Sequence, residues 1–114
     1  MKEFPADQTA ELKALFPGVS IGEEGDFTYY LIPALRLPDG CHPAVVDALL
    51  CPMLRDGYES RLFYSEQVSS RVAKNWNVQN LLVLDRKWFG FSWKTNREGL
   101  RLAQMVMEHL CALK

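Results

Sequence analysis

The chain of 114 residues lacks the features that would place it in a membrane or send it out of the cell. It has no apolar run near the roughly 20 residues that a membrane-spanning helix needs. Its first residues, Met1-Lys2-Glu3-Phe4-Pro5, lack the apolar core of a secretion signal. We therefore expect a cytoplasmic protein that makes no contact with a membrane.

Cysteine is scarce, and its pattern favours neither a disulfide framework nor a metal site. The three cysteines, Cys41, Cys51 and Cys111, are odd in number and form no Cys-x-x-Cys pair, whereas secreted frameworks use even sets. His42 adjoins Cys41, and His109 lies two residues before Cys111. Neither spacing brings two ligands readily to one metal ion, so we expect no metal and no cofactor.

The common sequence signatures of catalysis are missing as well. No Gly-x-Ser-x-Gly elbow marks a hydrolase serine, and no glycine-rich loop with Gly-Lys-Ser/Thr offers a cradle for phosphates. Cys41 and His42 are weak candidates for a nucleophile and its base, because loop geometry can bring a thiol and an imidazole together. The alternative is a turn cysteine beside a polar histidine.

Hydrophobic residues make up 48% of the chain, enough for one packed core. We expect a single domain over residues 1–114. Apolar residues at helical spacing predict a short helix over residues 6–16, which Asp7 can cap and Pro17-Gly18 ends.

Apolar stretches of strand length joined by short turns predict an antiparallel meander over residues 27–37, 44–51 and 61–65. Pro33 interrupts the first of these strands and favours an edge position for it. The second strand is apolar on both faces except at Asp47, which favours an inner position. Residues 22–25 look like a polar turn, and shorter extended stretches are expected at residues 81–84 and 88–93.

The last element is predicted most directly. Thr95-Asn96-Arg97-Glu98 matches a capping box, in which the Thr95 hydroxyl accepts a hydrogen bond from the Glu98 N–H. An apolar stripe with helical period follows, made of Leu100, Ala103, Val106, Met107, Leu110 and Cys111. The fold class is therefore α+β, with a meander sheet flanked by a short N-terminal helix and a C-terminal amphipathic helix.

The net charge of −1 conceals an uneven distribution along the chain. Residues 1–70 hold five basic and eleven acidic side chains, whereas residues 71–101 hold seven basic and two acidic ones. Aromatic residues interleave with these cations, a pattern that can bind phosphates and stack on bases. One interpretation is thus a small module that binds nucleic acid or an acidic protein; the alternative buries the aromatic rings in the core. The candidate binding residues are Arg71, Lys74, Trp76, Arg86, Lys87 and Trp88.

The order of helix, strands, irregular stretch and closing helix resembles that of the ubiquitin-conjugating (UBC) fold. Asp56-Gly57-Tyr58 with the strand at residues 61–65 resembles the family's Tyr-Pro turn and third strand. Asn75-Trp76-Asn77-Val78 resembles its His-Pro-Asn-Ile motif, with Asn77 in the asparagine position. Leu82-Val83-Leu84-Asp85 resembles its Ile-Cys-Leu-Asp stretch, and Trp88 falls where a tryptophan follows the active cysteine.

This resemblance implies a UBC-like component of a prokaryotic system that conjugates a ubiquitin-like protein, some of which act in antiviral defence. The implied partners are the ubiquitin-like protein and its activating enzyme. Val83 occupies the position of the thioester-forming cysteine and cannot form a thioester, so a binding or scaffold subunit is implied. In a working member Asn77 would help to stabilise an oxyanion; the alternative is that Asn77 braces its loop through bonds to the backbone.

Overall fold

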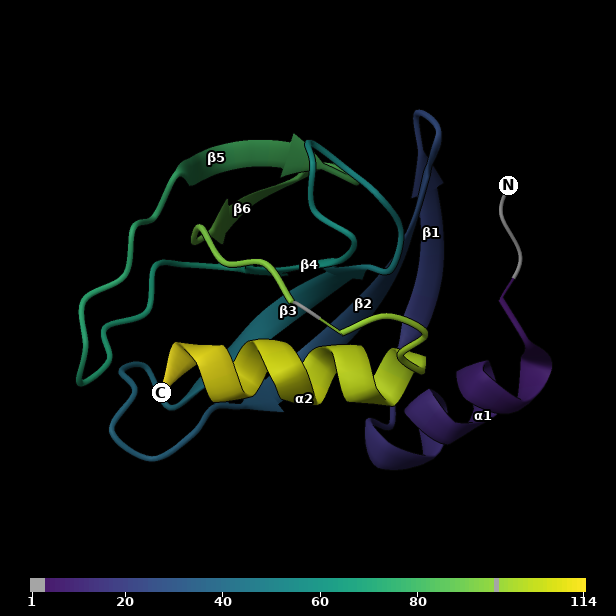
Figure 1. The fold of residues 1–114 in the computed structure, drawn as a ribbon, viewed down its shortest axis with the longest axis horizontal. Helices are drawn as coiled ribbons and strands as arrows, with labels where there is room; N and C mark the ends of the chain where they lie inside the picture. The colour runs from purple at the N-terminus through teal and green to yellow at the C-terminus, as the bar shows by residue number, and fades with distance from the viewer. Residues whose placement is uncertain (1–3, 96) are drawn as a thin grey trace.

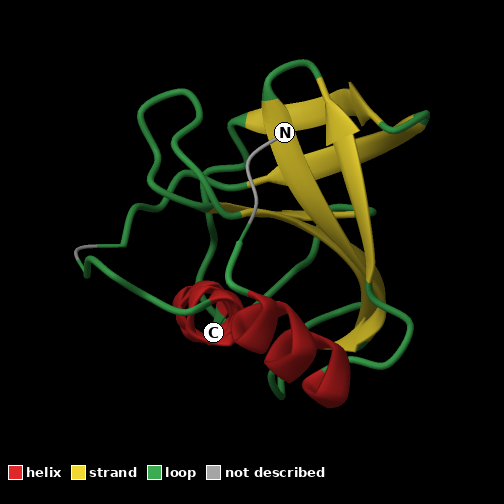
Figure 2. Cartoon of the chain, turned by 90° about the vertical axis from the view of Figure 1, so that its right-hand side faces the viewer, coloured by secondary structure: helices red, strands yellow, loops and turns green. Residues whose placement is uncertain are grey.

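The computed structural model describes residues 4–95 and 97–114 (Figure 1). Residues 1–3 of the stretch considered for a secretion signal, and Asn96 of the expected capping box, lie outside the described residues. Helices α1 (Ala6–Leu15) and α2 (Leu102–Leu113) lie on the same side of a curled sheet (Figure 2). Neither helix has the length and apolar character needed to cross a membrane, as far as the described residues extend.

The sheet has six strands in the order β1-β2-β3-β4-β6-β5, and every neighbouring pair is antiparallel. The strands are β1 (Ser20–Glu24), β2 (Phe27–Arg36), β3 (Val45–Cys51), β4 (Arg61–Tyr64), β5 (Val78–Val83) and β6 (Arg86–Gly90). The first four strands form a meander, and β6 then pairs with β4 and leaves β5 at the edge. The predicted α+β class, with its two flanking helices, is confirmed.

Strand β1 corrects two expectations. Residues 22–25 were expected to form a turn, yet Ser20–Glu24 pair with β2. The edge position leaves these residues exposed or half-buried, so they carry no alternating apolar pattern. Strand β2 is consequently an inner strand, contrary to the expectation from Pro33, whereas β3 is an inner strand as predicted.

A bulge in β2 explains how an inner strand accommodates Pro33. The register between β2 and β3 shifts between Ile32 and Leu35, and Ala34 takes a left-handed φ of 51°. The Ala34 N–H donates to Asp47 Oδ1 at 2.8 Å. The only polar residue of β3 therefore supplies an acceptor for a backbone donor that the bulge removes from the ladder.

Both helices begin differently from the prediction. Pro5 is the N-cap of α1, and Asp7 instead accepts from Arg101 Nη2 at 2.9 Å. Helix α2 begins at Leu102 rather than after Thr95, because Gly99 has a left-handed φ of 67° that interrupts a helix. The Arg101 N–H donates to Gln104 Oε1 at 2.8 Å and so closes the first turn of α2.

Buried apolar side chains form two clusters. The larger cluster lies between the helices and the sheet and includes Leu12, Tyr30, Leu50, Leu102 and Val106. The smaller cluster is formed by side chains on the opposite face of β2, β3 and β4 together with residues of the β5–β6 hairpin. Its members are Tyr29, Leu49, Cys51, Phe63, Val83 and Trp88.

Candidate functional site

Two stretches that carry the family resemblance meet in space at Asn77. The Asn77 Nδ2 group donates to the Tyr58 hydroxyl at 3.3 Å, and Asn77 Oδ1 accepts from Arg61 Nη2 at 3.3 Å. The Tyr58 hydroxyl also shares a hydrogen bond of 3.2 Å with Ser92 Oγ. With Lys94, whose Nζ lies 5.3 Å from the centre of the Tyr58 ring, these residues form what we call the Asn77 cluster.

Three separate segments position this cluster. Tyr58 ends a tight turn between β3 and β4, in which Arg55 and Tyr58 exchange backbone hydrogen bonds of 2.9 Å. Asn77 immediately precedes β5, and Ser92 follows β6. The Ser92 N–H donates to the Asn75 carbonyl at 2.8 Å and ties the two ends of the hairpin together.

Positive charge dominates the electrostatics of the Asn77 cluster. The side chain of Arg61 is only 3% exposed, lies 4.1 Å from the centre of the Tyr58 ring and donates to the Phe91 carbonyl at 3.1 Å. Burial lowers the pKa of the Arg61 guanidinium. The hydrogen bond from Ser92, helped by Asn77 and the two cations, lowers the pKa of the half-exposed Tyr58 hydroxyl. The cluster thus offers hydrogen-bonding groups beside one exposed cation, Lys94, while the Arg61 guanidinium is buried. Such a surface is suited to acidic or carbonyl-rich partners.

Val83, which the resemblance aligns with a reactive cysteine, lies inside the core. Its side chain is 1% exposed within the smaller cluster, and its carbonyl accepts from Trp88 Nε1 at 3.1 Å. Trp88 is also 1% exposed. The sequence made Trp88 a candidate binding residue, and the structure corrects this prediction. Trp88 is a core residue whose buried ring cannot contact a partner.

The weak nucleophile candidates Cys41 and His42 lie in the connection between β2 and β3. Cys41 is buried, and burial raises the pKa of its thiol, which disfavours the reactive thiolate. His42 is exposed and exchanges two backbone hydrogen bonds of 2.8 Å with Ser69. Within the described residues, no hydrogen bond joins the Cys41 thiol to the His42 ring, and no group of histidine, cysteine and acidic residues could hold a metal ion.

Arg71, Lys74 and Trp76 belong to the loop between β4 and β5, which lines a cavity of about 530 Å³. Arg71 is exposed, and Lys74 Nζ donates to the Val72 carbonyl at 2.9 Å and to the Lys114 carbonyl at 3.1 Å. Trp76 is half-buried, with its ring centre 5.5 Å from that of Phe91. The loop therefore exposes cations but packs its aromatic ring against the core.

The remaining basic residues of the segment are partly neutralised. Arg86, on β6, pairs with Asp47 at 2.9 Å, while its neighbour Lys87 is exposed. Arg97 pairs with Glu108 at 3.1 Å. The interleaved cations and aromatics of the sequence therefore do not form one surface, although binding of nucleic acid through the exposed cations stays a prediction.

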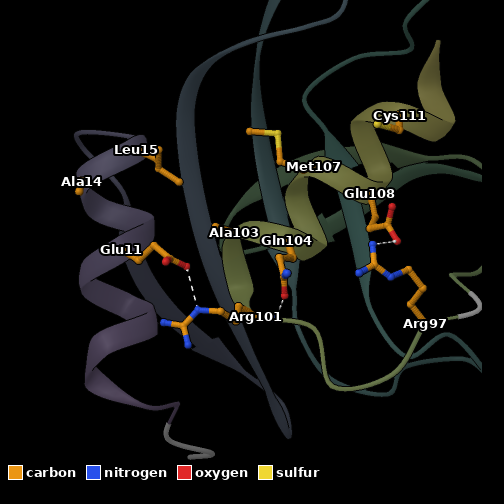
Figure 3. Close-up of a pocket in the computed structure, with 10 residues that line it drawn as sticks. All are labelled: Glu11, Ala14, Leu15, Arg97, Arg101, Ala103, Gln104, Met107, Glu108 and Cys111. Atoms are coloured by element: carbon orange, nitrogen blue, oxygen red, sulfur yellow. Dashed lines mark hydrogen bonds and ion pairs between the residues drawn. The ribbon is translucent and has the colours of Figure 1, made fainter.

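Two features were not found from the sequence. Ser60 Oγ and His109 Nε2 lie 3.0 Å apart in the interior, and no local pattern links residues that are 49 positions apart. Met107 belongs to the predicted apolar stripe of the last helix, yet Met107 is 47% exposed and Leu15 of α1 is 53% exposed. Figure 3 shows them on either side of a groove between α1 and α2.

No family model, curated protein or solved structure matches the chain.

Proposed function

We propose that the chain is a UBC-like protein-binding domain, a subunit of a prokaryotic ubiquitin-like conjugation system that forms no thioester itself. The contact between Asn77 and Tyr58 carries the proposal, because it joins the two stretches that resemble the family's asparagine motif and Tyr-Pro turn. The order of α1, the meander from β1 to β4, the irregular loop and the closing α2 supports the same resemblance. Strand β1 lengthens that meander directly after the first helix.

The placement of the cysteines supports a role in binding rather than catalysis. Cys41 and Cys51 are 4% and 0% exposed, and burial raises the pKa of both thiols. Cys111 is exposed but lies on α2, where it lines the groove of Figure 3. None of the three belongs to the Asn77 cluster, and Val83 offers no reactive group.

The Asn77 cluster indicates what its partner presents. The hydroxyls of Tyr58 and Ser92 and the amide of Asn77 suit carbonyl and hydroxyl groups, and Lys94 suits a carboxylate. A ubiquitin-like protein with an acidic or carbonyl-rich patch fits this surface. Since Lys94 is exposed, its contribution is also sensitive to salt.

A titration of the chain with the ubiquitin-like protein encoded beside its gene tests the proposal. We expect saturable, non-covalent binding that Tyr58→Phe weakens about fivefold, the effect of one lost hydrogen bond. Lys94→Glu should weaken it at least as much, whereas the same change at exposed Lys13 on α1 should leave it unaltered.

Three results would count against the proposal. These are the absence of such a gene, binding that ignores Tyr58→Phe and Lys94→Glu, and binding only to an oligonucleotide with a steep dependence on salt. The last result would favour the nucleic-acid module instead.

A further inference from the structure

The loop between β4 and β5 lines a cavity of about 530 Å³, which we call the loop pocket. The residues that line it are Gln67, Val68, Ser69, Ser70, Arg71, Ala73, Lys74 and Trp76. Small-molecule sites in proteins have volumes of this order, with a few polar groups that converge on the ligand. The loop pocket therefore has the size of a site for a small molecule.

Three sets of contacts hold the walls of the loop pocket in place. Ser69 and His42 exchange two backbone hydrogen bonds of 2.8 Å, which tie the loop to the β2–β3 connection. Lys74 Nζ donates to the backbone oxygen of Lys114 at 3.1 Å, and Figure 1 shows the loop beside this end of α2. Trp76 packs edge-on against two aromatic rings of the core. Tertiary contacts thus shape the pocket without a ligand.

Arg71 lies across the turn at Gly40. Gly40 has a left-handed φ of 90°, and a Cβ atom at this position would lie 2.8 Å from Arg71 Nε. Glycine both adopts this backbone conformation and leaves room for the arginine side chain. Within residues 4–95 and 97–114, Arg71 donates no hydrogen bond and makes no ion pair, so its guanidinium is available to a ligand.

The residues that line the loop pocket carry two positive charges and, in the described part of the chain, no negative one. Arg71 and Lys74 supply these charges. Burial raises the pKa of the Cys41 thiol, and the charges of Lys74 and Arg71 oppose this shift, which means that both cations lie close to one sulfur atom. Two neighbouring cations favour a ligand group that carries more than one negative charge.

A phosphate monoester matches these groups. It carries a charge of about −1.5 to −2 at pH 7 and presents three acceptor oxygens. The planar fork of Arg71 suits two of these oxygens, and the exposed hydroxyl of Ser69 lines the same cavity. The pocket is many times larger than the ~30 Å³ of a water molecule, so it has room for an organic part. Because Trp76 forms a wall of the pocket, that part is best matched by a planar ring.

We propose that the loop pocket binds a small phosphate monoester with a planar ring, such as a nucleoside 5′-monophosphate, with its phosphate at Arg71 and Lys74 and its ring at Trp76. The pocket shares no residue with the Asn77 cluster. The inference therefore goes beyond the proposed binding of a ubiquitin-like protein and does not depend on it.

Calorimetric titration of the full chain with four probes tests the proposal. The first probe is adenosine 5′-monophosphate (AMP), for which we expect saturable binding at concentrations up to about 1 mM. Adenosine lacks the phosphate, the methyl ester of AMP carries a single negative charge, and inorganic phosphate lacks the ring. Each of these three probes should bind more weakly than AMP, since each lacks one group that the pocket recognises.

Arg71→Gln should weaken the binding of AMP about tenfold, as the loss of a hydrogen bond between charged groups does. Arg71 is exposed in a loop, so the variant should fold. Lys87→Gln is the matched control, because Lys87 is an exposed cation on β6 that does not line the pocket. This control should leave the affinity for AMP unaltered.

The proposal is overturned if AMP does not bind at about 1 mM, or if any of the other three probes binds as tightly as AMP. It is also overturned if Arg71→Gln weakens binding no more than Lys87→Gln does. An oligonucleotide without a terminal phosphate that binds more tightly than AMP, with a steep dependence on salt, would favour the nucleic-acid module instead. Tyr58→Phe should leave the affinity for AMP unchanged, which separates this pocket from the Asn77 cluster.

Discussion

His109 is held in its neutral form inside the molecule. Its ring is 4% exposed, hydrogen-bonded to the Ser60 hydroxyl at 3.0 Å and packed edge-on against Trp93 with ring centres 4.9 Å apart. Burial, together with the nearby charge of Arg61, lowers the pKa of His109 to about 4. Since α2 carries this residue, the protonation of His109 is linked to the stability of the closing helix.

The free energy of unfolding should therefore fall in mild acid. An unfolded histidine has a pKa near 6.5, so between about pH 6.5 and pH 4 the unfolded chain binds more protons than the folded one. The full loss across this window is about 3 kcal/mol, and urea denaturation at a series of pH values measures it.

His109→Gln keeps a hydrogen-bonding group and should flatten this part of the profile, whereas His42→Gln at an exposed position should not. If the free energy of unfolding of the His109→Gln protein still falls as steeply between pH 6.5 and pH 4, His109 is not the group responsible for the loss.

At the residue scale, the sequence indicated which positions are unusual but not what they contact. Asp47 stands out as the only polar residue in an apolar strand, yet its role depends on a bulge in the neighbouring strand and on Arg86, 39 positions away. Ser60 and His109 carry no such signal. Tertiary hydrogen bonds between distant residues leave no periodicity in the sequence, so pattern analysis does not find them.

At the scale of elements, the first turn of α2 distinguishes the predicted cap from the observed one. Gln104 accepts from the Arg101 N–H at 2.8 Å, whereas Thr95 accepts from the Arg97 N–H at 3.2 Å, outside the helix. Gln104→Ala should lower the free energy of unfolding by about 0.5–1 kcal/mol, as the loss of a capping interaction does. Thr95→Ala should cost less than about 0.5 kcal/mol, as for most surface substitutions.

Thermal or urea denaturation of the two variants provides the comparison. A larger loss of stability for Thr95→Ala than for Gln104→Ala would favour the cap predicted from the sequence. The mismatch has a physical origin, because Gly99 turns the chain through a left-handed conformation between the capping pattern and the apolar stripe.

The strands differ in how clearly their sequences predict them. The strands β2, β3 and β4 were predicted within a few residues because they are rich in apolar side chains, most of which are buried. The edge strands β1 and β5 have exposed or half-buried residues at most positions, so β1 was missed and β5 was predicted shorter than it is. Edge strands are recognised by what they pair with, and sequence periodicity does not report pairing.

At the scale of the molecule, the charge asymmetry of the sequence is partly cancelled in space. The acidic first part supplies Asp47 to Arg86, and Asp7 and Glu11 to Arg101. The basic segment is thereby partly a set of structural ion pairs. Its remaining exposed cations include Arg71, Lys87 and Lys94, which lie on separate elements.

The candidate site could be predicted only in part. Asn77 was identified through its motif-like surroundings, but Ser92 and Lys94 join it only because the β5–β6 hairpin folds back beside the Tyr58 turn. The groove between the helices was not foreseen, because helical spacing assigns Leu15 and Met107 to an apolar face without saying whether another element covers that face.

The most direct test of the central claim, binding without thioester formation, is a charging assay. The chain is incubated with ATP and with an activating enzyme and a ubiquitin-like protein of a prokaryotic conjugation system, and the products are separated without reductant. We predict no adduct sensitive to dithiothreitol under conditions where non-covalent binding is measured. A dithiothreitol-sensitive adduct that disappears in one of the Cys41→Ser, Cys51→Ser and Cys111→Ser variants would contradict the claim and identify a nucleophile.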